Sequence, residues 1–343
     1  MEGESNDDDE FWQVALCRDE AVARVGLAES ESDDDVSSAA APAITYNIPW
    51  RANASTTLKL SPLPDQNGIW SPLGAQAWHA SSLLVAYLLQ NTILRKDVSS
   101  QGSLLTKYLD WWFHSGDKQY GFTALELGSG AVGLVGIVLG LILGDCYQAT
   151  RSLQQGDENI SATIPRVILT DNEPNVLSNL QQNVVNTQAM LPNKTGRNLA
   201  LLDVENLDWG DEFILPSSLQ QSSGGLQLVV GSELVYTHAT AKACAQVVLS
   251  ILDHSPNVLV FILQVTDRDG WNNVFLPKLR EKEHLQVISE EDGIHDSDLH
   301  ELAMTLIPPG GTLDRFAYGG VFIFRRSGVV ASLLELQERN ELD

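Results

Sequence analysis

The sequence predicts an α/β protein with a doubly wound, mostly parallel sheet of seven strands and helices on both faces. Short, solidly apolar strands alternate with longer segments in which apolar residues recur at helical spacing, and a glycine turn follows the first strand of the core. Strands that are apolar throughout are typical of parallel sheets covered on both faces. Ligands bind beyond the carboxyl ends of the strands in such sheets, so the functional residues are expected there.

The residues before the core divide into a tail and an extension. Residues 1–35 hold thirteen acidic residues against two arginines. Such a composition cannot bury enough apolar surface to offset chain entropy, so residues 1–43 are predicted to form a mostly disordered acidic tail. Residues 44–95 form an N-terminal extension, with a small β-hairpin in AITYNIPW and TTLKL and a lead-in helix in GAQAWHASSLLVAYLLQN.

The predicted domain spans residues 44–327, its catalytic core spans residues 121–327, and residues 328–343 form a C-terminal helix or tail. The first strand of the core is FTALEL, which leads through the glycine turn into the helix AVGLVGIVLGLIL, and the polar stretch DCYQATRSLQQGDENISATIP is predicted to be a surface loop. The next predicted strands are RVILTD, NLALL, LQLVVGS and NVLVFILQV, and the predicted helices are NVLSNLQQNVVN, HATAKACAQVVLSIL and NNVFLPKLREK. HLQVIS and YGGVFIFRR end the domain as a hairpin-like pair, which predicts an antiparallel member at the edge of the sheet and an antiparallel last strand.

Charge and composition exclude some functions. The net charge of −24 repels phosphate backbones and anionic lipids, so neither nucleic acid nor membrane is expected as a partner. No run of eighteen apolar residues predicts a membrane span.

The cysteines and the N-terminus indicate a compartment. Cys17, Cys146 and Cys244 lie far apart and form no CxxC pair, which predicts neither a disulfide framework nor a zinc site. The acidic N-terminus does not have the pattern of a secretory signal. A cytoplasmic or nuclear location and a site without metal are therefore expected. The sequence indicates no oligomeric state.

The glycine turn has the spacing of a dinucleotide site, but it follows an acid. Gly128, Gly130 and Gly133 match the nicotinamide and flavin pattern. Glu126 sits badly beside a pyrophosphate and suits a ligand with a positive ammonium group. Asp171 ends the second core strand, in the position that grips ribose hydroxyls. A ligand with an amino-acid end and a ribose is S-adenosylmethionine, and a nicotinamide-dependent oxidoreductase is the alternative. Gly133 is expected to allow close packing of helix on strand.

Five segments carry a family resemblance: GAQAWHASSLLVAYL, LELGSGAVG, LTDNEPNVLSNLQQNV, LDWG and VVGSELVY. In this order they resemble the class I methyltransferases and, more narrowly, the seven-strand protein-lysine methyltransferases of family 16, which include elongation-factor, chaperone and calmodulin methylating enzymes. The resemblance covers residues 66–326. It implies a Rossmann-like methyltransferase fold, S-adenosyl-L-methionine as cofactor, and methyl transfer to a nitrogen, foremost lysine, of a protein substrate such as a translation factor or chaperone.

The resemblance also implies roles for individual residues. Trp78 would lie over the cofactor, Asp171 would accept hydrogen bonds from the ribose, and Trp209 would pack against the adenine. The residues expected to bind the cofactor are Trp78, Glu126, Gly128, Ser129, Gly130, Asp171, Trp209 and Ser232.

Glu233 and Tyr236 are the predicted catalytic residues. They stand where the family has Asp-x-x-Tyr, and the glutamate is one methylene longer. The acid would orient a lysine ammonium, and the ring would flank the methyl-accepting nitrogen through cation–π contact. A histidine acceptor stays open, because related histidine-directed enzymes tolerate a glutamate here. A scaffold that retains the cofactor without turnover, with the acidic tail binding a basic partner, stays open as well.

Overall fold

The computed structural model describes residues 43–50, 54–63, 79–94, 103–115, 121–153, 163–195, 199–210, 225–290, 296–307 and 318–326, with four further residues between 213 and 219. The predicted acidic tail, the C-terminal segment 328–343 and Trp78 lie outside these residues.

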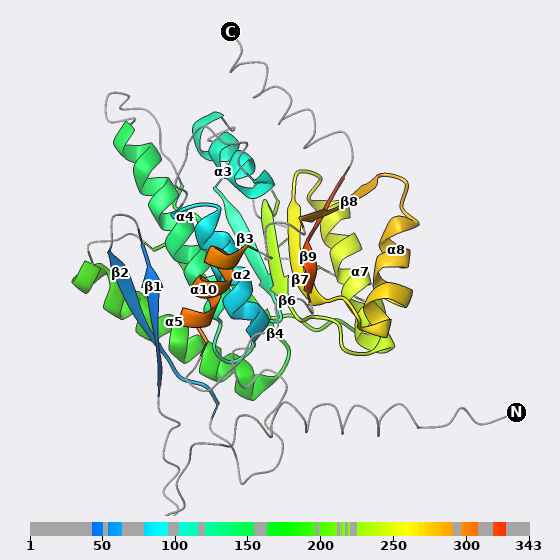
Figure 1. Cartoon of the computed structure of the whole chain (residues 1–343), viewed down its shortest axis with the longest axis horizontal. Helices are drawn as coiled ribbons and strands as arrows, with labels where there is room; N and C mark the ends of the chain where they lie inside the picture. The colour runs from blue at the N-terminus through cyan, green and yellow to red at the C-terminus, as the bar shows by residue number, and fades with distance from the viewer. Residues whose placement is uncertain are drawn as a thin grey trace, which may run out of the picture.

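A seven-stranded sheet in the order β5-β4-β3-β6-β7-β9-β8 forms the centre of the described structure (Figure 1). The strands are β3 (Thr123–Leu127), β4 (Arg166–Asp171), β5 (Leu201–Asn206), β6 (Leu228–Ser232), β7 (Leu259–Val265), β8 (Leu285–Glu290) and β9 (Tyr318–Arg326). The first five strands in the spatial order pair in parallel, whereas β9 is antiparallel to β7 and to β8. The predicted mostly parallel sheet with an antiparallel last strand is therefore confirmed.

Helices cover both faces of the sheet, as the sequence predicts (Figure 1). One face carries α2 (His79–Gln90), α3 (Leu104–Ser115), α4 (Leu134–Leu153), α5 (Pro174–Thr195) and α10 (Ser297–Thr305), and the other carries α7 (His238–His254), the π-helix η2 (Trp271–Phe275) and α8 (Leu276–Arg280). Each face has its own apolar cluster. Ala124 of β3 belongs to the first cluster and its neighbour Leu125 to the second, because successive strand residues point to opposite faces. This two-sided burial explains why the core strands are apolar throughout.

The predicted N-terminal hairpin is also confirmed. Strands β1 (Ile44–Pro49) and β2 (Ser55–Leu60) pair antiparallel and lie beside α5 (Figure 1). Alternate residues such as Ile48 and Leu58 are fully buried, so one face of the hairpin extends the apolar cluster of the sheet.

Helix α4 is longer than the sequence predicts. The segment from Asp145 to Leu153 was expected to begin a surface loop, but it continues the helix, so that part of the prediction is wrong. The hydroxyl groups of Thr150 and Ser152 donate to the carbonyl groups four residues earlier, at 3.0 and 2.9 Å. Polar residues are therefore accommodated in the last turns, where the helix becomes partly exposed.

Helix α4 is also apolar enough, by length and composition, to cross a membrane. The stretch Leu134–Ser152 has a mean hydropathy of 1.2, and 67% of it is buried inside the described structure. It packs against α2, α3 and the sheet. Its composition is therefore accounted for by its place as a core helix.

The predicted antiparallel pair forms one edge of the sheet, with β8 outermost. Strand β9 lies inside it, because β8 pairs with its outer side. The side chains of β9 explain its inner position: Val321 and Ile323 enter one apolar cluster, and Phe322 and Phe324 enter the other. Strand β9 is thus buried on both faces, and β8 forms the edge.

Gly133 has the packing role that was expected of it. Its φ is +66°, and a Cβ atom there would lie 2.3 Å from Leu180 Cδ1 and 2.9 Å from Leu169 Cδ2. Distances this short leave no room for a methyl group between the turn, α5 and β4.

Gly133→Ala is expected to destabilise the protein by about 2–4 kcal/mol, because it adds overpacking to a left-handed backbone conformation. Thermal unfolding followed by circular dichroism should show a melting temperature lower by about 5–15 °C. Gly210→Ala is the matched control, since the nearest atom to its Cβ is Asp208 Oδ2 at 3.9 Å. Equal melting temperatures for the two variants would contradict the packing role.

Candidate active site

The pairing of β3 with β6 brings the predicted site residues to one edge of the sheet. Leu127 of β3 lies opposite Gly231 of β6, so Gly128 and Ser232 follow at the same edge. The chain continues from β3 to β4 on one side, whereas β6 lies on the other side. The two strands therefore flank the switch point at which ligands bind in sheets of this kind.

The glycine turn folds back onto the end of β4. Gly128 and Gly130 both have φ of +61°, which glycine adopts without the penalty of a side chain. Between them, the Ser129 backbone N–H donates to the Thr170 carbonyl at 2.7 Å, and Ser129 Oγ accepts from the Thr170 N–H at 3.0 Å. The turn is thus held by β4 as well as by its own strand.

Asp171 joins the glycine turn to the start of α5. One carboxylate oxygen accepts a hydrogen bond from the Gly130 N–H at 3.1 Å. The other accepts from the N–H groups of Asn172 and Glu173, at 2.9 and 3.2 Å. The side chain is half-buried, so it remains open to a ligand at the strand end. Its assignment to the ribose stays a prediction.

Two asparagines of α5 hold the far side of the turn. The side-chain amides of Asn179 and Asn183 both donate to the Ala131 carbonyl, at 2.9 and 3.0 Å. Both also donate to the Ser61 carbonyl, at 2.7 and 2.9 Å, which ties the exit of the hairpin to the same point. These contacts were not predicted, although both residues lie in the segment LTDNEPNVLSNLQQNV that carries part of the resemblance.

Glu126 lies beneath the first turns of α4. Its side chain is buried, and Oε2 accepts from the Gly136 N–H at 3.0 Å. A Cβ atom on Gly136 would lie 2.5 Å from that oxygen, so the contact depends on a glycine there. Burial raises the pKa of Glu126 to about 7; the charge of Asp171 adds to this, and hydrogen bonds from Ser129 and Gly136 oppose it. Its contact with a cofactor ammonium stays a prediction.

Trp209 reaches the glycine turn from the segment after β5. A Cβ atom on Gly128 would lie 3.2 Å from Leu234 Cδ2 and 3.8 Å from Trp209 Cη2. Ser232 at the end of β6 faces α2, where its hydroxyl lies 3.1 Å from Ser81 Oγ. The structure therefore brings together every predicted cofactor residue that it describes, from Glu126 to Ser232, at one edge of the sheet.

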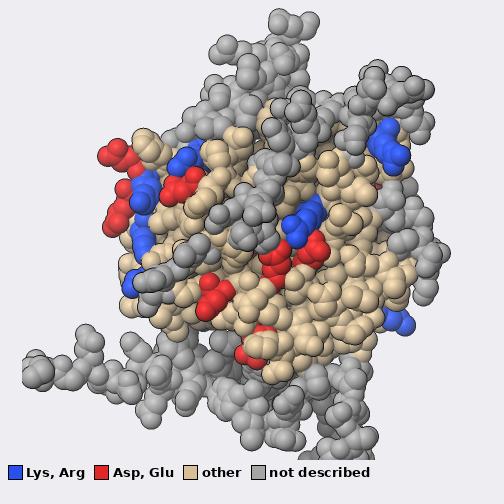
Figure 2. Space-filling model, turned by 180° about the vertical axis from the view of Figure 1, so that it is seen from behind, with Lys and Arg blue, Asp and Glu red and all other residues tan. Residues whose placement is uncertain are grey.

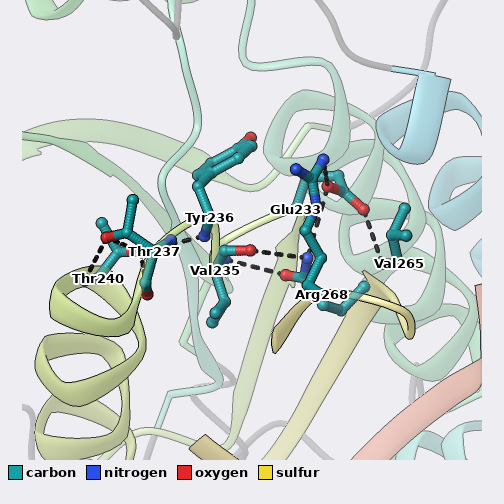
Figure 3. A network of polar contacts seen from close by, with 8 residues as sticks. Glu233, Val235, Tyr236, Thr237, Thr240, Val265 and Arg268 are labelled. Atoms are coloured by element: carbon teal, nitrogen blue, oxygen red, sulfur yellow. Dashed lines mark hydrogen bonds and ion pairs between the residues drawn. The ribbon is translucent and has the colours of Figure 1, made fainter. Parts of the chain in front are cut away.

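Glu233 and Tyr236 surround a side-chain cation that was not predicted, Arg268 (Figure 3). Glu233 has φ of +52°, the one positive φ at a non-glycine position among the described residues. Its carboxylate accepts from the Val265 N–H at 2.8 Å and lies 3.3 Å from Arg268 Nη2. The Arg268 guanidinium carbon lies 5.2 Å from the centre of the Tyr236 ring.

Burial dominates the electrostatics of this group. It raises the pKa of Glu233, and the positive charge of Arg268 offsets only part of the shift. Burial also raises the pKa of Tyr236, so the phenol stays protonated and does not serve as a base near neutral pH.

Gln264 of β7 holds the turn that carries both predicted catalytic residues. It is fully buried, and its amide accepts from the Val235 N–H at 3.0 Å and donates to the Val235 carbonyl at 3.1 Å. On the other side, the Tyr236 N–H donates to Thr240 Oγ1 in the capping box of α7 (Figure 3). Gln264 and Arg268 were not predicted, because no local motif marks them and only the pairing of β7 with β6 brings them to this turn.

The edge of the sheet fits the predicted cofactor. Trp209 offers an aromatic ring beside Gly128, and the Asp171 carboxylate accepts a hydrogen bond from Gly130 of the same turn. An aromatic face suits adenine, and a carboxylate suits ribose hydroxyls. The residues therefore fit a nucleoside bound beside the turn.

Charged side chains on the surface are mixed in sign. Figure 2 shows Lys and Arg lying beside Asp and Glu on one face of the described residues, without a continuous basic patch. Ion pairs such as Arg166–Glu205 and Arg326–Asp253, at 3.1 and 2.8 Å, join opposite charges. No group of three or more potential metal-binding His, Cys, Asp or Glu side chains occurs within the described part of the chain. The expected absence of nucleic-acid partners and of a metal stays a prediction.

Comparison with known proteins identifies a family. A model described as lysine methyltransferase matches residues 63–282. No curated protein matches the chain. Solved structures that match include an SAH-bound methyltransferase from Podospora anserina (12% identity, 78% of this chain and 90% of the other, TM-score 0.34) and a methyltransferase from Pyrococcus furiosus (12%, 71% and 98%, 0.32). An O-methyltransferase from Bacillus cereus in complex with SAH also matches (13%, 71% and 90%, 0.30). These likenesses are distant, so the family match carries the identification.

The buried carboxyl group of Glu126 predicts a specific pH dependence. Its pKa is raised from 4.5 to about 7 in the folded chain, so between these pH values the native state binds more protons than the unfolded state. The free energy of unfolding therefore falls as pH rises through this window, by about 3 kcal/mol.

In Glu126→Gln, which keeps an oxygen for the Gly136 N–H, this loss of unfolding free energy between pH 5 and pH 8 is expected to disappear. Urea unfolding of the cofactor-free protein checks it, with exposed Glu281→Gln as control. Parallel pH profiles for wild type and Glu126→Gln would contradict the raised pKa.

Asp171→Ala is expected to abolish binding of S-adenosylhomocysteine measured by calorimetry, because it removes the carboxylate expected to bind the ribose and its bond to Gly130. Asp203→Ala, at the half-exposed middle of β5, provides the control for removing an acid from a neighbouring strand. An unchanged affinity in Asp171→Ala would overturn the assignment.

Proposed function

The chain belongs to the lysine methyltransferase family, and from this premise we propose that it methylates lysine side chains of a protein substrate. Family membership makes it a methyltransferase that uses S-adenosylmethionine. The acceptor nitrogen and the kind of substrate are the proposal.

The observation that carries the proposal is the cation held at the end of β6. Glu233 and Tyr236 enclose the guanidinium of Arg268, so their carboxylate and ring suit a positively charged side chain. A lysine ammonium carries such a charge at neutral pH. An imidazole with its ordinary pKa of about 6.5 is mostly neutral there, so a site that suits a cation would bind the lysine side chain in preference to histidine.

The residues at the strand ends have separable tasks. Asp171 and Trp209 would hold the ribose and the adenine, and the glycine turn would hold the amino-acid end. The bound cofactor supplies an electrophilic methyl group on a sulfonium. Glu233 would orient the acceptor chain and Tyr236 would flank its nitrogen. Attack requires a neutral amine in line with the methyl group, so positioning matters more than strong acid–base catalysis.

The proposal extends to partners and location. A translation factor or chaperone as substrate follows from the family resemblance, and a cytoplasmic or nuclear location from the composition. The net charge of −24 supports attraction of a basic protein surface.

The two alternative functions, an oxidoreductase and a non-catalytic scaffold, need different tests. The family match does not favour the nicotinamide-dependent oxidoreductase. If S-adenosylhomocysteine raises the melting temperature and NAD does not, that alternative is excluded directly. The non-catalytic scaffold requires a test of turnover.

Incubating the purified protein with methyl-labelled S-adenosylmethionine and cell extract is expected to label protein, and hydrolysis should recover the label as methyl-lysine. Glu233→Gln keeps the shape but removes the charge, and its labelling should fall about ten- to a hundredfold. Asp171→Ala serves as the inactive control. Absence of label would favour the scaffold, and label on histidine would overturn the lysine assignment.

A further inference from the structure

Arg268 occupies the place that the proposed acceptor needs. It follows β7, whereas Glu233 and Tyr236 follow β6, and the parallel pairing of these strands brings the two loops together. Figure 3 shows Arg268 beside Glu233, with Tyr236 on the same turn. A guanidinium 3.3 Å from the carboxylate and 5.2 Å from the ring centre excludes a lysine ammonium from that position.

The contact between Arg268 and Glu233 is long. Strong charge-assisted hydrogen bonds between nitrogen and carboxylate oxygen span about 2.7–2.9 Å. At 3.3 Å, the Nη2–Oε2 contact is weaker than the bond that a well-placed ammonium would make. The Arg268 side chain also keeps 23% of its surface exposed, so a path to solvent is open to it.

The carboxylate is held independently of Arg268. The other oxygen of Glu233 accepts from the Val265 N–H at 2.8 Å, and the Glu233 N–H donates to the Leu263 carbonyl at 2.9 Å. Gln264 fixes the adjoining Val235 from both sides of its peptide. The cation seat formed by Glu233 and Tyr236 therefore keeps its shape when the guanidinium moves away.

We propose that Arg268 is a displaceable occupant of the acceptor site, and that an acceptor lysine binds by replacing its guanidinium between Glu233 and Tyr236. Arg268 is then a specificity-determining residue, because a side chain without positive charge cannot compete for the seat. This inference rests on the proposed function, since it assigns the seat to the acceptor.

Binding of n-butylammonium, a surrogate for the lysine side chain, tests the proposal. The measurement is the rise in melting temperature of the full chain saturated with S-adenosylhomocysteine, at constant ionic strength. Arg268→Met removes the occupant, and Arg268→Gln removes its charge but keeps an N–H donor for Glu233. Both variants are expected to bind n-butylammonium about tenfold more tightly than wild type. Their affinity for n-butanol, which has no charge, should not change.

Arg326→Met is the matched control, because Arg326 pairs with Asp253 at the far end of β9. It should bind n-butylammonium as wild type does. Equal or weaker binding in the Arg268 variants would overturn the displacement. Failure of both variants to fold would also overturn it, since the seat must tolerate departure of the guanidinium.

The labelling experiment keeps the two proposals apart. Methyl-lysine in the extract together with unchanged n-butylammonium affinity would refute only the role of Arg268. Tighter n-butylammonium binding without labelled protein would support the cation seat and refute the proposed reaction. With an isolated acceptor protein, Arg268→Gln should lower KM, because no guanidinium has to be displaced, and should lower kcat as well, because the charge that favours loss of the ammonium proton is gone; a purely structural role would not lower both.

Discussion

The parallel pairing of β3 with β6 is the constraint on which the site depends. With Leu127 opposite Gly231, the glycine turn and the Glu233 turn leave the sheet side by side. Leu234 packs against both glycines: a Cβ atom placed on Gly128 would lie 3.2 Å from Leu234 Cδ2, and one placed on Gly231 would lie 2.6 Å from Leu234 Cδ1. A one-residue shift of register would reverse the faces to which β6 presents its side chains and would separate these contacts. The predicted cofactor edge and the proposed acceptor seat are therefore set by one pairing.

Two buried glutamates illustrate how the strand ends are stabilised. Glu126 accepts the N–H of Gly136 in the following helix, and Glu233 accepts the N–H of Val265 on the neighbouring strand. Burial raises the pKa of both, so each carboxylate opposes folding when charged and is tolerated because a backbone donor faces it. The same contacts fix the two turns relative to the sheet. The two carboxylates thus lower the stability of the fold while they hold the two turns in place, which is common at functional sites.

The sequence predicted the sheet well because burial on both faces demands apolar strands, and RVILTD coincides with β4. Strand β5 begins at Leu201, three residues later than expected, because pairing with β4 decides its bounds. Helices α3 and α10 and the inner place of β9 were not predicted, since they depend on packing between distant segments. At the site, the strand-end acids Glu126 and Asp171 were recognisable from their positions. The contact of Arg268 with Glu233 was not, because it joins residues 35 apart that only the β6–β7 pairing brings together.

A cation seat and a neutral nucleophile make opposite demands on the acceptor. A carboxylate that bound an ammonium tightly would hold the nitrogen charged, and tighter ground-state binding alone does not speed the transfer. Glu233 is expected to bind a cation only moderately, for two reasons. Burial disfavours the charged form of its carboxyl group, and one carboxylate oxygen already accepts a hydrogen bond from the Val265 N–H. In the proposed exchange, a displaced Arg268 would remain attached in the loop after β7, so its positive charge would stay near the arriving ammonium and would favour loss of the proton. The residue proposed to exclude uncharged side chains from the seat would thereby also favour the neutral amine that the proposed reaction requires.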